Sequence, residues 1–354
     1  MNSKRNHYLD FCRGLVAINV ILIHIFYGAG YNYTPDWCRN LSLILDVPFF
    51  FFLAGWSRGL TSEFDFSKTL KSLVTTYKRY VQALILITIV GIMVIWIGSG
   101  DFPVTRTFLN DAIASLVFKQ NFALEIGIFF NSMWFLQVYF TVIPLTTLLL
   151  GFMKLQNSNL KKGSVILFFC FLFGYLATFY GTKYFDINFS LTTWFYSLFF
   201  LEGYILAESK PLKIKQFLIL AVALGIGVIF CFIKNPNFTT MQSLKFPPHF
   251  SYFIYSQIFI VIALYFKRLK IKSSNIFALI GRHAINFYFC QGITTSLLFN
   301  IIPHFNMNVP LKLLVCFSLG LITTVILAYL LNWFYKIFDY VEKHTLVILK
   351  KIFS

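Results

Sequence analysis

Charged side chains are scarce in this sequence of 354 residues, where Asp, Glu, Lys and Arg together make up 12% of positions. Ordinary soluble domains contain about 25% charged residues. Acidic residues are the rarer sign, with 13 Asp and Glu against 30 Lys and Arg. This shortage of charge, together with a mean hydropathy of +0.73, excludes an ordinary soluble domain.

Cysteine is sparse and lacks the arrangements found in disulfide-rich or metal-binding proteins. The six cysteines include no Cys-x-x-Cys pair, and none pairs with His at the spacing of metal ligands. Most of them lie inside apolar stretches, which is typical of small buried hydrophobic residues. The sequence therefore predicts neither a disulfide framework nor a metal site.

Motifs of several other protein classes are missing. Neither a GxxxxGK[ST] run nor a strand-linked GxGxxG is present, which argues against ATP-driven work. No fixed-period repeat and no pair of Gly/Pro-broken spans in matching halves is evident, which argues against many secondary transporters. The net charge of +17 comes from Lys and Arg scattered between apolar segments, so we expect no nucleic-acid partner.

Long apolar runs dominate what is present, because 58% of the residues are hydrophobic and 20% are aromatic. Ten runs have the length of about 17 to 25 residues that a transmembrane helix needs. The first run is too long for a cleavable signal peptide, so we expect it to stay as a span. The predicted fold class is all-α, a polytopic membrane helix bundle that forms one domain over residues 1–354. The predicted spans are 11–30, 41–60, 80–98, 132–151, 163–180, 190–207, 215–233, 249–267, 283–302 and 311–335.

The distribution of Lys and Arg predicts how these spans are oriented. Cytoplasmic loops are enriched in Lys and Arg, and one alternating set of segments contains 22 of them against six in the other set. This bias places both termini in the cytoplasm. The longest connection on the opposite side runs from Asp101 to Asn131. We expect it to lie along the outer surface or to enter the membrane as a re-entrant piece.

The first predicted span carries ionisable side chains on one face, within the sequence LDFCRGLVAINVILIH from Leu9. Helical spacing places Arg13 and His24 on nearly the same face, about 16 Å apart along the axis, with Asp10 close to Arg13. Ionisable groups inside a membrane are costly and usually face a cavity or a partner, which favours a functional site. The alternative is a neutral His24 that hydrogen-bonds another helix.

Five stretches of the chain carry recognisable motifs. The first has Leu9, Asp10, Arg13 and Gly14 followed along the same span by His24, and the others are DVPFFFFLAGW from Asp46, SMWFLQVYF from Ser132, FFLEGYIL from Phe199 and KFPPHFSYFIY from Lys245. In these stretches the chain resembles the acyltransferase-3 family, the bacterial integral-membrane acyltransferases that commonly O-acetylate surface polysaccharides. The opening motif is the most specific match, and the resemblance covers nearly the whole chain.

The sequence departs from the pattern of that family in two places. Many relatives have a His near the ninth span where this chain has Gln291, and an amide does not act as an acid or a base. Relatives also tend to carry two arginines separated by two residues near the third span, whereas Lys78 and Arg79 are adjacent here.

The resemblance implies acetyl-CoA as the acyl donor and roles for the polar residues of the first span. His24 is the candidate general base, because an imidazole with a pKa of about 6.5 suits removal of a proton from a sugar hydroxyl. Arg13 would bind the phosphate or the thioester carbonyl of the donor, and Asp10 would hold Arg13. The alternative for Asp10 and Arg13 is an ordinary interfacial salt bridge.

Three cations at the borders of the second and third spans, Arg58, Lys78 and Arg79, are candidates for binding the phosphates of acetyl-CoA. They are equally explained as topology determinants that face the cytoplasm and the lipid headgroups. Trp134 is a candidate for stacking on a sugar ring or a member of the aromatic belt. Glu202 is a second candidate for a buried acid near the site or a solvated interfacial carboxylate.

The sequence therefore predicts a membrane-bound O-acetyltransferase of the bacterial inner membrane, surrounded by lipid, that acts on a surface polysaccharide or its lipid-linked precursor and needs no metal. The alternative is a polytopic transporter or flippase for a glycan or a small solute. In that case His24 and Glu202 would relay protons.

Overall fold

The computed structural model describes residues 5–30, 32–61, 66–99, 110, 113–117, 134–155, 160–181, 188–234, 241–302 and 306–353. Within these ranges the chain is helical and has no strand, apart from an isolated bridge between Lys245 and Pro248. The helices are α1 (His7–His24), η1 (Ile25–Ala29), α2 (Asp36–Ser42), α3 (Val47–Gly59), α4 (Phe66–Ser99), α7 (Trp134–Leu155), α8 (Leu160–Gly181), α9 (Asn188–Leu206), α10 (Ile214–Lys234), η2 (Met241–Leu244), α11 (Phe250–Phe266), α12 (Ile276–Arg282), α13 (Ala284–Ile301) and α14 (Val309–Phe353).

The all-α fold is confirmed, and each predicted span overlaps a helix of the structure. Six stretches among the described residues are long and apolar enough to cross a membrane. The total of ten spans and the cytoplasmic position of both termini stay predictions. Most of the connection from Asp101 to Asn131 lies outside the described residues, which include only residues 110 and 113–117 of it. The six stretches are His7–Gly28, Asp36–Gly59, Trp134–Lys154, Lys161–Tyr180, Ile214–Ile233 and Val309–Thr345.

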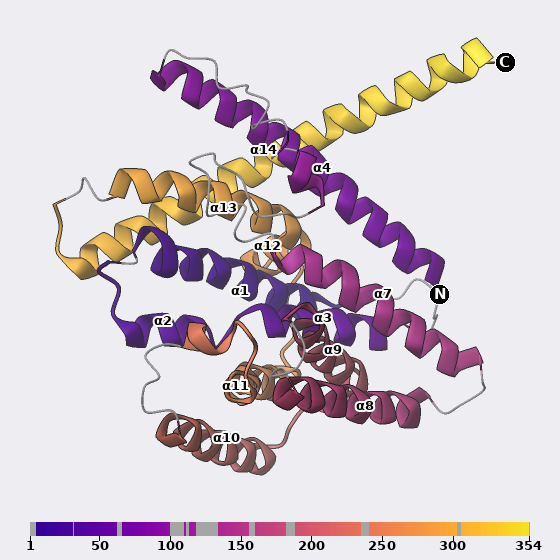
Figure 1. The fold of residues 1–354 in the computed structure, drawn as a ribbon, viewed down its shortest axis with the longest axis vertical. Coiled ribbons are helices and arrows are strands. Elements are labelled where there is room, and N and C mark those ends of the chain that lie inside the picture. Colours follow the sequence, from indigo (N-terminus) through magenta and orange to yellow (C-terminus); the bar gives the residue numbers. More distant parts are fainter. Residues whose placement is uncertain are drawn as a thin grey trace.

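Helix α1 runs through the middle of the molecule (Figure 1), with α8, α10 and α11 on one side and α4, α13 and α14 on the other. Its first turn is capped by Asn6, whose side-chain oxygen accepts hydrogen bonds from the backbone N–H groups of Tyr8 and Leu9. Helices α4 and α14 cross at the top of this view, and α14 continues beyond the bundle. The 45 residues of α14 correspond to roughly 67 Å, about twice the thickness of a bilayer core.

Two pairs of glycines bring helices into backbone contact near the centre. A Cβ added at Gly14 would overlap the carbonyl oxygen of Phe277 on α12, and one added at Gly281 would overlap that of Asp10 on α1. Gly55 on α3 and Gly203 on α9 make the same reciprocal contact. Small residues let membrane helices approach this closely. The crossings fix the faces of α1 and α3 that carry the candidate site.

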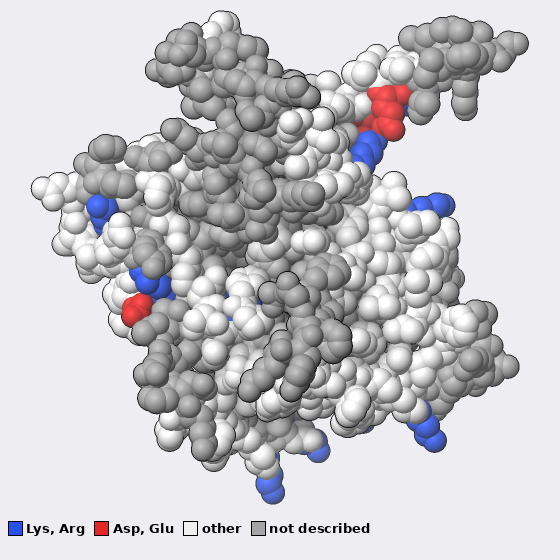
Figure 2. All heavy atoms as spheres, viewed as in Figure 1, with Lys and Arg blue, Asp and Glu red and all other residues white. Residues whose placement is uncertain are grey.

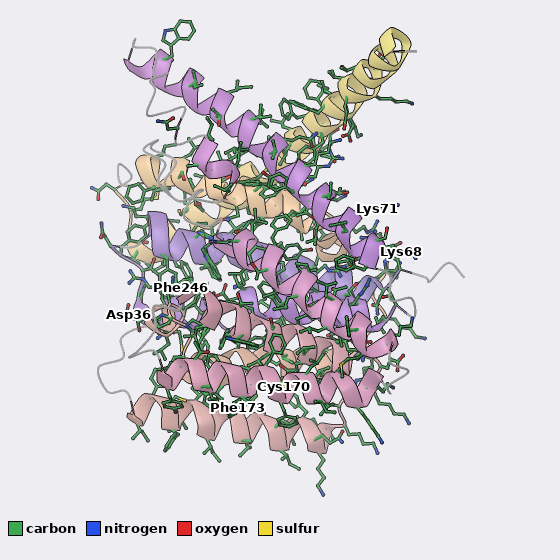
Figure 3. The ribbon with its side chains drawn as sticks, turned by 45° about the vertical axis from the view of Figure 1, so that its right-hand side comes forward. Asp36, Lys68, Lys71, Cys170, Phe173 and Phe246 are labelled. Atoms are coloured by element: carbon green, nitrogen blue, oxygen red, sulfur yellow. The ribbon has the colours of Figure 1, made fainter. Side chains whose placement is uncertain are left out.

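The outer surface is largely apolar, as expected for a chain surrounded by lipid. Among the described residues, charged side chains on the face in Figure 2 are few, and most of them lie near its margins. Phe173 on α8 is 75% exposed, and Cys170 on the same helix is also exposed (Figure 3). In that view Lys68 lies at one end of the molecule and Asp36 at the other. The helices therefore run between two polar ends with an apolar belt between them.

Candidate functional site

Asp10 near the start of α1 is buried and holds two arginines. Its carboxylate accepts hydrogen bonds from Arg5 Nε at 2.6 Å and from Arg13 Nη1 at 3.3 Å, and the residue is 1% exposed. The predicted pairing of Asp10 with Arg13 is therefore present. Arg5 makes the shorter contact, and the sequence reading missed it because it precedes the helix and the motif. A buried carboxylate shared by two guanidinium groups holds both in place.

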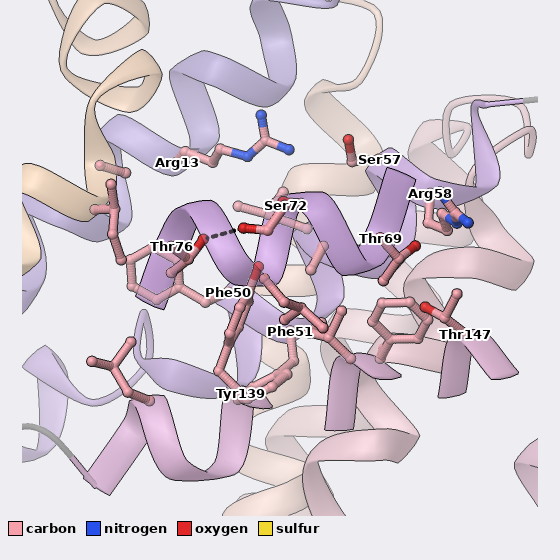
Figure 4. Close-up of a pocket in the computed structure, with 18 of the residues that line it drawn as sticks. Arg13, Phe50, Phe51, Ser57, Arg58, Thr69, Ser72, Thr76, Tyr139 and Thr147 are labelled. Atoms are coloured by element: carbon pink, nitrogen blue, oxygen red, sulfur yellow. Dashed lines mark hydrogen bonds between the residues drawn. The ribbon is translucent and has the colours of Figure 1, made fainter. Parts of the chain in front are cut away.

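A cavity of about 440 Å³, which we call the inner cavity, lies beside Arg13 (Figure 4). Arg13, Arg58 and Lys68 supply cationic groups to its lining. Hydroxyl groups form a second part of the lining, and aromatic rings form a third. The hydroxyl side chains are Ser57, Thr61, Thr69, Ser72, Thr76, Tyr139, Thr147 and Tyr288, and the phenylalanines are Phe50, Phe51, Phe135 and Phe200.

Lys78 and Arg79 lie elsewhere on α4, at its crossing with α14. Lys78 pairs with both Asp339 and Glu342, and Arg79 Nη2 lies 2.8 Å from Asp339 Oδ2. The Arg79 guanidinium also stacks over the ring of Tyr335, 4.5 Å from its centroid. Neither residue lines the inner cavity. Of the three predicted cations, the structure brings only Arg58 to the cavity that contains Arg13.

A second cavity of about 240 Å³, the outer cavity, lies at the other end of α1. It is lined by His24 and Tyr27, by Asp46 at the start of α3, by Trp134 of α7 and by Lys245, which follows η2. The candidate base and the candidate sugar-stacking residue therefore face one space. The spacing along α1 correctly separated His24 from Arg13, since the two residues line different cavities.

A buried ion pair forms part of the wall of the outer cavity. Lys245 Nζ and the Tyr252 hydroxyl both donate to Asp46 Oδ2 at 2.6 Å. The side chains of Lys245 and Asp46 are 6% and 2% exposed. Isolated charges are costly at such depth, so each of these groups depends on the other. The sequence reading did not single out these three residues, although Asp46 and Lys245 begin two of the motif stretches.

Aromatic rings border the outer cavity beside this pair. Trp134 and Phe246 meet edge to face, with ring centroids 4.8 Å apart. Lys245 Nζ lies 5.2 Å from the centroid of the Trp134 ring. The Tyr27 hydroxyl and the Gln242 side-chain oxygen are buried and have no hydrogen-bond partner among the described residues. The outer cavity thus combines aromatic faces with polar groups available to a ligand.

Glu202 and Gln291 lie away from both cavities. The Glu202 carboxylate accepts a hydrogen bond of 2.9 Å from the Gln257 side chain, and no ion pair with Arg13 occurs in the described part of the chain. Gln291 is fully buried on α13, and neither its amide nitrogen nor its side-chain oxygen has a partner among the described residues. Neither residue contacts the space that His24 faces.

The two cavities adjoin each other. Phe50, Phe135 and Tyr288 belong to the lining of both, so these three rings separate the compartment of Arg13 from that of His24. Over the described residues, no group of three or more His, Cys, Asp or Glu side chains has the arrangement of a metal site.

Comparison with known proteins identifies a family. A protein-family model described as an acyltransferase domain matches residues 6–333 of the chain. No curated protein and no solved structure matches. The matched range includes every residue of both cavities.

Proposed function

This chain belongs to the acyltransferase family whose domain model covers residues 6–333, and we propose that it moves an acetyl group from acetyl-CoA to a hydroxyl of a surface polysaccharide or its lipid-linked precursor. The observation that carries the proposal is the pair of adjoining cavities on either side of three aromatic rings. An enzyme that transfers an acetyl group from a donor to an acceptor needs one binding space for each substrate, and the two spaces must meet where the transfer takes place.

The inner cavity suits the donor. Arg13 and Arg58 offer guanidinium groups that pair well with phosphate oxygens, and the hydroxyl groups of the lining offer partners to the amides of a pantetheine arm. The aromatic rings at the other end of this cavity suit the thioester. The contribution of Lys78 and Arg79 to donor binding stays a prediction, and it would require donor contacts outside this cavity.

The outer cavity suits one ring of a carbohydrate acceptor. Its volume of about 240 Å³ lies below the roughly 300 to 1,000 Å³ typical of ligand pockets, which favours a small ligand. Trp134 and Phe246 offer ring faces for stacking, and Asp46 and Gln242 offer oxygen atoms to hydroxyl groups. The role of Glu202 as a substrate-binding acid is not supported by a contact with this cavity.

His24 lines the outer cavity and is the proposed general base. It takes the proton of the acceptor hydroxyl as that oxygen attacks the thioester carbon. The new C–O bond forms while the C–S bond breaks, and the imidazolium then returns the proton to the thiolate of CoA. Arg13, held by Asp10, positions the donor rather than the base, because the two residues line separate cavities.

The predicted orientation matches this division of substrates. The inner cavity lies toward the end of the molecule that carries Lys68, which the charge bias places in the cytoplasm, where acetyl-CoA is made. The outer cavity lies toward the end that carries Asp36 and Phe246. We accordingly propose a multi-pass protein of the bacterial cytoplasmic membrane that acetylates a glycan from the outer side.

Substitution of the base tests the proposal. Cells that lack the chromosomal copy and produce either the wild-type chain or His24→Ala are compared for O-acetyl content of their polysaccharide by mass spectrometry. We expect His24→Ala to lower transfer by about 10² to 10⁴-fold, which is the usual contribution of a general base.

Phe173→Ala is the matched control, because this lipid-exposed side chain contacts neither cavity. Both variants must reach wild-type levels in the membrane. Normal acetylation by His24→Ala would remove His24 from the mechanism. A different result would favour the transporter: the wild-type chain transfers no acyl group, and glycan export is lost in cells that lack the chain.

A further inference from the structure

Three aromatic side chains form the boundary between the two cavities. Phe50 comes from α3, Phe135 from α7 and Tyr288 from α13, and each lines both spaces. The ring centroids of Phe50 and Phe135 lie 5.8 Å apart, and those of Phe135 and Tyr288 lie 5.1 Å apart. Such separations are those of rings in direct contact. We call these three residues the aromatic partition.

We propose that the aromatic partition selects the acyl group, so that a two-carbon acyl group reaches His24 while longer acyl groups are rejected. The inference rests on the proposed function, since it assigns the donor to the inner cavity and the acceptor to the outer one. Only the acyl carbon has to pass the partition for the acceptor oxygen to attack it. The CoA moiety and the sugar each remain on their own side.

The partition fits this task because it places aromatic rings between two spaces that each carry polar groups. Arg13 and Arg58 line the inner side, whereas His24, Asp46 and Lys245 line the outer side. Closely packed aromatic rings between two polar spaces exclude water from the thioester until the acyl group is in place. The same rings limit the length of the group, because in a filled apolar site one extra methylene is discriminated by about 10 to 200-fold.

Acyl transfer through the partition needs no reactant other than the acyl-CoA and the acceptor hydroxyl. The hydroxyl oxygen of the acceptor forms a bond with the acyl carbon, and the bond between that carbon and the sulfur of CoA breaks. The proton of the hydroxyl passes through His24 to the thiolate. The products are the acylated glycan and free CoA, whatever the length of the acyl chain.

Phe50 is the member of the partition whose removal is most informative. It is half-buried, whereas Phe135 and Tyr288 are 8% and 7% exposed and belong to the core. Phe135 also contacts the rings of Phe51 and Tyr139, so its loss would disturb the packing of α3 against α7. Phe50→Ala opens the boundary from the side of α3 and leaves those contacts in place.

The experiment measures acyl selectivity in inside-out membrane vesicles from native cells that lack the chromosomal copy and carry one variant each. Radiolabelled acetyl-CoA, propionyl-CoA or butyryl-CoA is added, and the label incorporated into the glycan fraction is counted. Ile143→Ala enlarges only the inner cavity and Ile23→Ala only the outer one. These two variants are the controls for volume alone, and membranes that lack the chain give the background.

We expect the wild-type chain to prefer acetyl over butyryl by at least about tenfold, and Phe50→Ala to reduce that preference by about tenfold or more. Phe50→Leu should give an intermediate ratio and replaces Phe50→Ala if that variant does not accumulate. Both controls should retain the wild-type ratio.

Two results would overturn the inference, and they are distinguishable. If the wild-type chain transfers acetyl but the ratio stays the same in Phe50→Ala and Phe50→Leu, the partition does not select the acyl group, while the proposed acyl transfer stands. If the wild-type chain incorporates no label above the background of membranes that lack the chain, from any of the three donors, the proposed function itself fails.

Discussion

One buried carboxylate lies at each end of the candidate site. At one end Asp10 is shared by Arg5 and Arg13, and at the other Asp46 is shared by Lys245 and Tyr252. In each case a carboxylate with little exposure collects more than one donor, which offsets part of the cost of burying it. The contact between Asp10 and Arg13 could be anticipated, because the two residues are three positions apart on one helix. The contact between Asp46 and Lys245 joins positions about 200 residues apart, so no local pattern indicates it.

The Asp46 and Lys245 pair supports a prediction about stability at this scale. Lys245→Met leaves the Asp46 carboxylate buried without its cation, and Asp46→Asn leaves the ammonium group without its anion. We expect each substitution to lower the free energy of unfolding by about 3 to 5 kcal/mol, because an unpaired buried charge remains. Thermal unfolding of the detergent-solubilised variants measures the effect.

The double variant Asp46→Asn, Lys245→Met is the internal control for this prediction. It removes both charges, so it should be more stable than the sum of the two single losses indicates. Strictly additive effects would mean that the two groups act on stability independently of each other, contrary to the 2.6 Å contact.

At the scale of helices, glycine contacts decide where the site residues lie. Gly14 follows Arg13 directly and meets the backbone of α12, so the turn of α1 that carries Arg13 is held against a neighbouring helix. Gly55 plays the same part on α3, one turn before Arg58, where it meets the backbone of α9. These crossings leave the remaining faces of α1 and α3 to line the cavities. A side chain at either glycine would separate the helices.

Substitution of these glycines tests that account. Gly14→Ala places a methyl group on the carbonyl of Phe277 and should destabilise the protein by about 1 to 3 kcal/mol or more. Gly225→Ala on α10 is the matched control, because a Cβ there has nothing within 4 Å. Alanine is the better helix former, so this control should be neutral or stabilising by up to about 1 kcal/mol.

Melting temperatures in detergent distinguish the two glycine variants, and donor binding provides a second readout. Gly14→Ala should also weaken binding of acetyl-CoA, because α1 positions Arg13 in the inner cavity. Equal melting temperatures for Gly14→Ala and Gly225→Ala would show that α1 and α12 are not held together by this contact.

At the scale of the whole molecule, two cavities in series run from one polar end toward the other. Their order along α1 follows from the order of Arg13 and His24 in the chain. Which side of the membrane each cavity faces depends on how the protein is oriented in the membrane. If both termini lie in the cytoplasm, as the charge bias predicts, the proposed donor cavity opens toward cytoplasmic acetyl-CoA and the proposed acceptor cavity opens toward the outside.

Reporter fusions test this orientation. Green fluorescent protein fused after Ser354 should fluoresce, since it folds in the cytoplasm, and alkaline phosphatase fused at the same position should be inactive. A phosphatase fusion within the segment 235–240, between α10 and η2, should be active. The opposite pattern would place the donor cavity on the outer side and remove cytoplasmic acetyl-CoA as the donor.

The sequence by itself determined the helical membrane fold, the approximate positions of ten of the helices and the placement of Asp10, Arg13 and His24 along the first of them, although α4 and α14 extend well beyond the predicted spans 80–98 and 311–335. These features depend on apolar length and on a period of 3.6 residues, both of which are local properties of the chain. Only the tertiary structure decided that Lys245 joins Asp46, that Lys78 and Arg79 pair with α14, and that three aromatic rings divide the site into two cavities. Such contacts join residues far apart in the chain, and they are set by how helices pack rather than by the pattern within any one of them.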